Sequence, residues 1–250
     1  RPSVRKYRGS LFVDEARRFW LIEEWQLWKN TTTDLVESLH QSGMRIYWEE
    51  LEDKVDFVFS CLHGKYGEEA LPGLLEIINL PSNCASVLGG ALSMDKCHQR
   101  LVLEANGINI PEFFPVEIND WNLSRERVMT AIEEKLKYPF MIKPSREGSS
   151  TALHKVKSRS EIEEAVNDAF QYDNVILAEE VLEGMELTTA VYGIDDDVKA
   201  LPPSQLIKGG DYLTAEEKFL PGGARMITPP PITPELVKKV QEESIRAFRS

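Results

Sequence analysis

The stretch Phe140-Met141-Ile142-Lys143-Pro144-Ser145-Arg146-Glu147-Gly148-Ser149-Ser150 joins a short apolar segment to a polar turn. Its first part predicts a strand, and Lys143 at the end of that strand needs an anionic partner because burial of an unpaired cation is costly. Gly148 exposes backbone N–H groups, and Ser149 and Ser150 add hydroxyl donors, a combination that can wrap a polyphosphate. The alternative interpretation is an ordinary flexible turn.

Strands alternate with helices on both sides of this stretch, which predicts an α/β protein. Helices are expected over residues 73–80 and over 94–106, the second with Ser93 as its N-cap. A third begins at a capping box of Ser160 and Glu163, and a fourth runs from Thr233 onwards. The expected strands are a pair within 10–28 turned around Asp14–Arg17, a buried parallel strand over 55–62, and strands over 175–178 and 187–192.

Composition excludes several classes of protein. The net charge of −12 argues against a nucleic-acid partner, because such affinity comes largely from Lys and Arg meeting phosphates. No apolar run approaches the length needed to span a bilayer, and the N-terminus does not resemble a signal peptide. Three cysteines without a CxxC pair predict neither a disulfide framework nor a zinc site. We therefore expect a cytoplasmic protein with no membrane partner.

The common nucleotide, zinc and serine-hydrolase motifs are missing from the sequence. What remains is a set of lysines in a particular order. Lys96 falls in the first turn of an expected helix, where a cation opposes the helix dipole. Taken alone it is a solvated surface lysine, but together with Lys143 and the Gly148 turn it indicates a site for an anionic ligand.

These segments resemble the D-alanine–D-alanine ligases of the ATP-grasp superfamily. The resemblance rests on their order and spacing, and it runs from about residue 55 to the end, whereas the first fifty residues match weakly. Its segments are Leu62-His63-Gly64-Lys65-Tyr66-Gly67-Glu68, Met94-Asp95-Lys96, Ile142 to Ser150, Glu179 with Glu186, and Glu217-Lys218-Phe219. It implies an N-terminal α/β domain over residues 1–81, a central ATP-grasp subdomain over 82–178 and an incomplete C-terminal subdomain over 179–250.

The family implies an activity in which ATP phosphorylates the carboxylate of one D-alanine and the amine of a second displaces the phosphate. Lys96 and Lys143 would then neutralise the ATP phosphates, with Ser149 and Ser150 in the adjoining loop. Glu179 and Leu182 would flank the adenine, and Glu180 would also belong to the nucleotide-binding residues. Glu186 would accept hydrogen bonds from the ribose.

The resemblance also implies roles in catalysis. Lys218 would reach the γ-phosphate from a loop that closes over the site, and Ser149 would help to lock that loop. His63 would lie near the carboxylate of the first D-alanine. Each of these residues also has an interpretation without a functional role, as a solvated surface group or as a side chain that forms hydrogen bonds to backbone groups at the end of a strand. A homodimer is carried over from the family in the same way.

The family pattern breaks at several points. The Gly-Gly-x-Ser segment with which the family opens is not found. Where the family has Gly-Glu-Asp-Gly and Tyr-Thr-Gly, this sequence has Gly67-Glu68-Glu69-Ala70 and Ser82-Asn83-Cys84. These differences put the first-substrate pocket in doubt. Phe219 replaces a tyrosine, a change associated in the family with D-lactate as the second substrate. The family's magnesium ligands are expected beyond residue 250, so within the chain we expect no metal ligand. This predicts an inactive 250-residue chain, and it leaves a non-catalytic nucleotide-binding protein as an alternative of another class.

Overall fold

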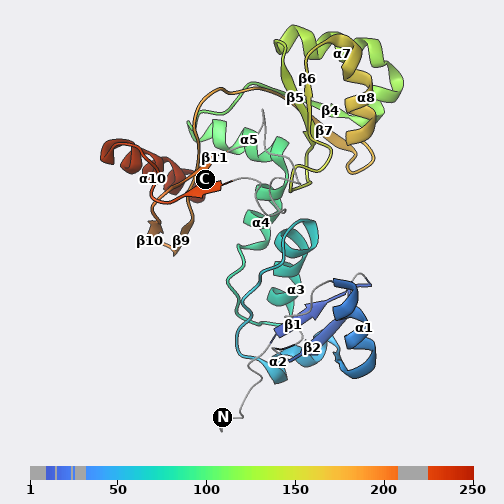
Figure 1. Cartoon of the computed structure of the whole chain (residues 1–250), viewed down its shortest axis with the longest axis vertical. Helices are drawn as coiled ribbons and strands as arrows, with labels where there is room; N and C mark the ends of the chain where they lie inside the picture. The colour runs from blue at the N-terminus through green and yellow to red at the C-terminus, as the bar shows by residue number, and fades with distance from the viewer. Residues whose placement is uncertain (1–9, 15, 24, 26–31, 208–224) are drawn as a thin grey trace. The chain divides into compact units, whose positions relative to one another are not determined.

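The computed structural model describes residues 10–14, 16–23, 25, 32–207 and 225–250. The chain divides into two compact units, Arg1–Gly90 and Ala91–Ser250 (Figure 1). The sequence-based division at residues 81 and 178 stays a prediction. Among the described residues, no helix is long and apolar enough to cross a membrane.

The first unit contains a small antiparallel sheet. Its strands are β1 (Ser10–Val13), β2 (Phe19–Ile22) and β3 (Met44–Ile46), in the order β1-β2-β3. The predicted strand pair around Asp14–Arg17 is therefore confirmed. Burial alone would raise the pKa of Asp14, but hydrogen bonds from the Arg18 backbone, from the Trp20 indole and from the Arg18 side chain lower it to about 2. The paired carboxylate thus fixes the turn between the two strands.

Helical segments complete this unit. They are α1 (Thr32–Ser42), η2 (Trp48–Glu50), α2 (Leu51–Lys54), the π-helix η3 (Lys65–Ala70) and α3 (Leu71–Ile77). Two apolar clusters form the core of the unit. One is built on Trp20, Ile22, Leu35 and Leu39, and the other on Ile46, Leu51, Leu75 and Leu80. The helix predicted over 73–80 exists, but it begins and ends earlier as α3.

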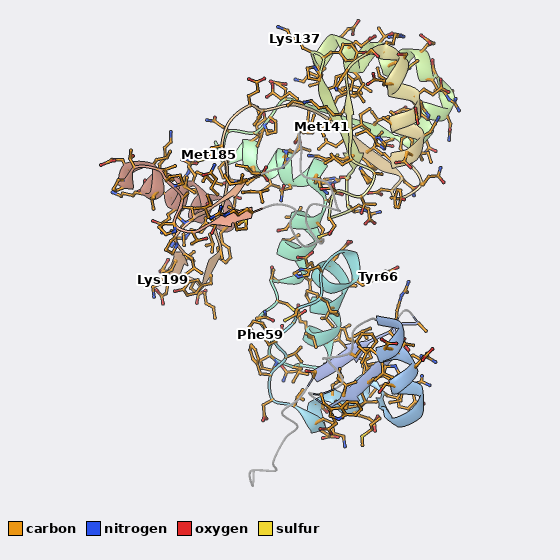
Figure 2. The ribbon with its side chains drawn as sticks, in the orientation of Figure 1. Phe59, Tyr66, Lys137, Met141, Met185 and Lys199 are labelled. Carbon is orange, nitrogen blue, oxygen red and sulfur yellow. The ribbon has the colours of Figure 1, made fainter. Side chains whose placement is uncertain are left out.

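The predicted buried parallel strand over 55–62 is wrong. In the described part of this segment only an isolated parallel bridge joins Val58 to Ser82. The ladder stops there because the next backbone donor, Ser60 N, bonds to the Asn83 side chain at 2.7 Å instead of to a neighbouring strand. Phe59, labelled in Figure 2, is consequently 73% exposed.

The second unit is built on a four-stranded antiparallel sheet. Its order is β4 (Phe113–Glu117), β7 (Val175–Glu180), β5 (Phe140–Pro144) and β6 (His154–Val156). The helices α6 (Ile118–Leu123), α7 (Arg125–Lys135) and α8 (Arg159–Ala169) pack on one face, where α7 and α8 lie side by side in Figure 1. The predicted strands at 140–144 and 175–178 are thus confirmed, and the largest apolar core lies between this sheet and these helices.

Side-chain alternation gives the two faces of this sheet different chemistry. Phe140 and Ile142 are fully buried in the core under the helices. Successive side chains point to opposite faces, so Met141 and Lys143 lie on the other side, where Met141 pairs in register with Glu179 of β7. Helix α5 (Lys96–Ala105) meets this second face through Arg100, which bonds to Glu179. The charged residues of the predicted site therefore occupy the face without the helix-covered core.

Two predicted helix starts need correction. Ser93 does not cap the helix that carries Lys96; it lies inside α4 (Val87–Met94), and Asp95 is the N-cap of α5. Its carboxylate accepts from two successive N–H groups, which a serine two residues earlier cannot reach. Likewise, α8 starts after Ser158, and Glu161 rather than Glu163 bonds back, to the N–H of Lys157.

The rest of the second unit consists of short strands and a long helix. Strands β12 (Arg225–Ile227), β11 (Ser204–Ile207) and β8 (Glu186–Thr188) form one sheet, and β9 (Val191–Ile194) pairs with β10 (Asp197–Ala200). The single strand predicted over 187–192 is therefore split, and Thr189 bonds to Leu201 O between its halves. Helix α10 (Pro234–Arg249) begins as predicted, with Thr233 Oγ1 accepting from Leu236 N, and packs on β10.

The core under α7 and α8 yields a stability prediction. Ile132 is completely buried there, whereas Ile194 in β9 is 79% exposed. Replacement of Ile132 by Ala should lower the free energy of unfolding by about 2–5 kcal/mol, because it removes buried methyl groups and leaves a cavity. The matched change Ile194→Ala should cost less than about 1 kcal/mol. Urea unfolding of both variants measures the difference, and equal losses would contradict this assignment of the core.

Candidate functional site

Lys96 is held at the first position of α5 by the end of strand β5. Its backbone N–H and its ammonium both donate to Ser145 O, at 3.1 Å each, and the ammonium also bonds to Glu147 O. Burial, and after it repulsion from the neighbouring cations Lys143 and Arg100, lowers the pKa of Lys96 to about 8. Lys143 is therefore near enough to act on the Lys96 ammonium, and convergence of the two lysines on one triphosphate stays a prediction.

Lys143 and Arg100 share one buried carboxylate. The Lys143 ammonium pairs with Glu179 Oε2, and Arg100 Nε and Nη2 approach Glu179 Oε1 at 2.8 and 2.6 Å. The side chain of Glu179 is only 8% exposed and that of Lys143 only 18%. Lys143 and Arg100 thus share the Glu179 carboxylate, and both cations act on the ammonium of Lys96, which donates to backbone oxygens instead. The arrangement suits an additional anion, because three neighbouring cations in a poorly exposed site attract one.

The serine turn begins directly beside this cluster. Ser149 and Ser150 both have positive φ, at 53° and 61°, and Thr151 N closes the turn on Gly148 O at 3.0 Å. Left-handed backbone is unusual for residues with a side chain and is retained where surrounding structure holds it. Glu147 O at the base of the turn accepts from Lys96, so the loop and the lysine belong to one site.

Other predicted nucleotide-binding residues line a hollow of about 810 Å³ in the second unit. Glu180, Leu182 and Glu186 belong to its lining, together with Lys137 and Met185, which Figure 2 labels. This volume is within the range of small-molecule and cofactor sites. Glu179, grouped with these residues by the sequence, is not part of that lining and is instead ion-paired with Lys143 and Arg100. Glu180 is also tied to β4, because its Oε1 accepts from Glu112 N at 2.9 Å.

His63 and Lys218 complete the set of predicted site residues. His63 belongs to the first unit, where its side chain is 86% exposed and Nδ1 lies 3.7 Å from Glu68 Oε1. Lys218, with its neighbours Glu217 and Phe219, lies outside the described residues. Their roles stay predictions.

Sequence reasoning missed three residues of the site. Arg100 follows Lys96 by four positions, a spacing that puts both cations on one helix face and could have indicated it. Asp95 was part of the quoted motif but received no role, although it caps α5 and accepts from Ser145 Oγ at 2.8 Å. Asp173 holds Arg146 from the opposite side, and no local pattern marks it.

Comparison with known proteins gives a consistent result. The family model described as "D-ala D-ala ligase C-terminus" matches residues 102–250. A D-alanine–D-alanine ligase of Carboxydothermus hydrogenoformans is 34% identical over 200 residues, which cover 80% of this chain and 64% of the relative. A second, of Natranaerobius thermophilus, is 28% identical over 226 residues, which cover 88% and 62%. The chain thus spans about six tenths of the length of these curated relatives.

Solved structures agree. A VanG D-Ala:D-Ser ligase from Enterococcus faecalis has a TM-score of 0.78 at 25% identity, covering 96% of this chain and 71% of its own. The D-alanine–D-alanine ligase from Coxiella burnetii has a TM-score of 0.75 at 27% identity, covering 96% and 66%. With the family model matching more than half of its residues, the chain belongs to the D-alanine–D-alanine ligase family and has the ATP-grasp fold.

Proposed function

We propose that this chain binds ATP with the triphosphate on Lys96 and Lys143, and that it serves the joining of two D-alanines for peptidoglycan precursor synthesis. The observation that carries the proposal is the convergence of these two ammonium groups beside the Gly148 turn. Burial is the main cause of the lowered pKa of Lys96, and repulsion from Lys143 contributes to it. A bound triphosphate would relieve this repulsion, so the site gains most from a ligand with several negative charges.

Phosphoryl transfer from ATP requires positive charge such as that of Lys96 and Lys143 near the phosphates. Phosphoryl transfer from ATP to a D-alanine carboxylate forms a D-alanyl phosphate, which the amine of the second D-alanine attacks while phosphate leaves. Negative charge develops on the transferred group, and preformed cations stabilise it without reorganisation. Lys96 and Lys143 would supply that stabilisation, and Ser149 and Ser150 would cover the phosphates from the adjoining turn.

The hollow beside strand β8 would receive the rest of the nucleotide. Leu182 would contact the adenine, Glu180 would border it, and the carboxylate of Glu186 would accept from the ribose hydroxyls. Glu179 would act differently from the sequence-based expectation, as the counterion that holds Lys143 and Arg100 in place. Lys218 as a γ-phosphate ligand and His63 as a D-alanine contact remain part of the proposal through the family alone.

Magnesium is the usual counterion of ATP in this chemistry. The described residues contain no group of three or more His, Cys, Asp or Glu side chains that could hold a metal ion.

Two lysine substitutions test the site. Lys96→Met and Lys143→Met should each weaken binding of a non-hydrolysable ATP analogue roughly ten- to hundredfold, because each removes a charge-assisted contact to a phosphate. Lys238→Met is the matched control, since Lys238 lies on α10 with a side chain that is 77% exposed. Isothermal titration calorimetry gives the affinities. A wild-type chain that does not bind the analogue, or equal effects of all three substitutions, would contradict the proposal.

The pH dependence of binding provides a second test. Because the pKa of Lys96 is about 8, the free protein loses this charge as the pH rises through 8. A triphosphate favours the protonated form and raises the pKa, so binding above pH 8 should take up a proton and affinity should decline there, while below about pH 7 neither effect occurs. Calorimetry in buffers of different ionisation enthalpy measures the uptake. Lys96→Arg should abolish it, because a guanidinium stays charged throughout; uptake that persists in this variant would assign it to another group.

Turnover tests the reaction itself. ADP release is followed by a coupled assay with ATP, magnesium and D-alanine, and dipeptide is detected by mass spectrometry. The sequence-based expectation is that the 250-residue chain releases no ADP at ordinary enzyme rates. Addition of D-lactate tests the alternative suggested by Phe219, for which an ester product is expected. Nucleotide binding that does not change with magnesium or D-alanine, and no turnover in a chain extended at its C-terminus, would favour the non-catalytic alternative.

A further inference from the structure

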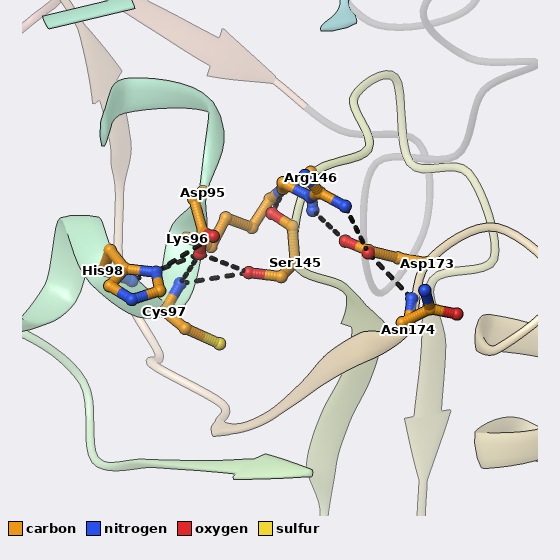
Figure 3. Close-up of polar contacts among 8 residues, drawn as sticks. All are labelled: Asp95, Lys96, Cys97, His98, Ser145, Arg146, Asp173 and Asn174. Atoms are coloured by element: carbon orange, nitrogen blue, oxygen red, sulfur yellow. Dashed lines mark hydrogen bonds and ion pairs between the residues drawn. The ribbon is translucent and has the colours of Figure 1, made fainter. Parts of the chain in front are cut away.

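Two carboxylates, the half-buried Asp95 and the buried Asp173, hold the segment that supports Lys96. Ser145 and Arg146, immediately after β5, lie between Asp95 and Asp173 (Figure 3). Ser145 is completely buried, and Asp173 is 8% exposed. The family resemblance implies no function for either carboxylate, and the nucleotide contacts proposed above use neither of them.

Asp95 joins the helix to the strand end. One of its oxygens, Oδ1, accepts from Cys97 N at 3.1 Å and His98 N at 3.2 Å, which caps α5, and from Ser145 Oγ at 2.8 Å. Ser145 Oγ in turn accepts from Cys97 N at 3.2 Å. The same small set of bonds therefore fixes both the start of α5 and its distance from β5.

Asp173 fixes the other side of the segment. Its Oδ2 accepts from Arg146 N at 2.8 Å, and its Oδ1 accepts from Arg146 Nη2 at 3.2 Å and from Asn174 N at 2.8 Å. In addition, Ser145 N donates to Val175 O at 3.0 Å. Backbone groups of both Ser145 and Arg146 are thus tied to the start of β7.

These bonds determine the position of the acceptor that holds the Lys96 ammonium. Ser145 O, whose position these bonds determine, accepts from both the N–H and the ammonium of Lys96. A long lysine side chain has many rotamers, and a fixed acceptor at each end of it removes most of them before a ligand arrives. Preorganisation of this kind increases affinity by reducing the ordering that binding requires.

We propose that Asp95 and Ser145 are positioning residues for Lys96, and that Asp173 anchors the segment through which they act. The inference rests on the proposed nucleotide site, since it assigns these residues an effect on phosphate binding. It differs from a merely structural role in one respect. A structural role lowers nucleotide affinity whether or not Lys96 is present, whereas a positioning role acts only through Lys96.

A double-mutant cycle separates the two roles. Ser145→Ala keeps the Asp95 cap of α5 but removes its bond to the strand end. It should weaken binding of the non-hydrolysable ATP analogue about five- to thirtyfold in the wild-type background, the effect of one lost hydrogen bond. In the Lys96→Ala background the same substitution should change affinity by less than about twofold, because the interaction it supports is already gone. The same fold-loss in both backgrounds would overturn the proposal.

Three further variants provide a control and test the role of the Asp95 oxygen. Ser124→Ala is the matched control, since Ser124 Oγ also accepts a helix N-terminal N–H, from Arg127 at 3.4 Å on α7, and it should leave nucleotide affinity unchanged. Asp95→Asn retains an oxygen acceptor and should bind nearly as the wild type does, whereas Asp95→Ala should behave like Ser145→Ala. An Asp95→Asn loss as large as that of Asp95→Ala would contradict positioning through the Ser145 bond.

Amide hydrogen exchange without nucleotide distinguishes failure of this inference from failure of the proposed function. Ser145→Ala should accelerate exchange at the Lys96 and Cys97 amides, while Ser124→Ala should not. Accelerated exchange in a chain that binds no nucleotide would defeat the proposed function and with it the role in phosphate binding, but would leave the hydrogen-bond network established. Normal nucleotide binding by Ser145→Ala in a binding-competent chain would defeat the positioning role alone.

Discussion

The carboxylate of Glu179, shared between Lys143 and Arg100, connects the three elements on which the site depends. Lys143 comes from β5, Glu179 from β7 and Arg100 from α5. Charges this poorly exposed are costly to desolvate unless they pair, and removal of one partner leaves the other uncompensated. The shared ion pair therefore keeps α5 against the sheet while it holds two cations close to the position expected for a polyphosphate.

The sheet makes this arrangement possible because its two faces have separate tasks. Apolar residues such as Phe140 and Ile142 pack under α7 and α8 and stabilise the unit. Their neighbours Met141 and Lys143 point the other way by the alternation of a strand. A rigid, helix-covered face thus supports a charged face, and functional side chains on strands are held more precisely than those on loops.

Hydrogen-bond acceptors offset part of the repulsion among Lys96, Lys143 and Arg100: backbone carbonyl oxygens for Lys96 and the Glu179 carboxylate for the other two. Lys96 is surrounded by carbonyl oxygens of Ser145 and Glu147 and does not pair directly with a carboxylate. Burial and the neighbouring cations lower the pKa of this ammonium to about 8. A group so placed responds most strongly to an incoming anion, which agrees with the nucleotide site proposed here.

The sequence by itself determined the local elements and the family. The apolar run ending in Lys143, the Thr233-Pro234 helix start and the strand pair around Asp14 each carry their signal within a few residues, so short-range propensity suffices to predict them. Lys96, Lys143 and the Gly148 turn indicated a site for an anionic ligand, and the family resemblance added Glu179 to it. Prediction from the sequence failed for residues 55–62, where an apolar run indicates a strand. There the backbone N–H of Ser60 donates to the Asn83 side chain and is not available to a neighbouring strand.

Only the tertiary structure decided which partners these charges have. Glu179 pairs with Arg100 across 79 positions, and Ser145 meets Asp95 across 50. Helix and strand periodicity predict which face a side chain occupies, but not which distant element covers that face. The partner depends on packing of the whole sheet against α5, because hydrogen bonds and ion pairs need separations of a few ångströms that no local pattern fixes.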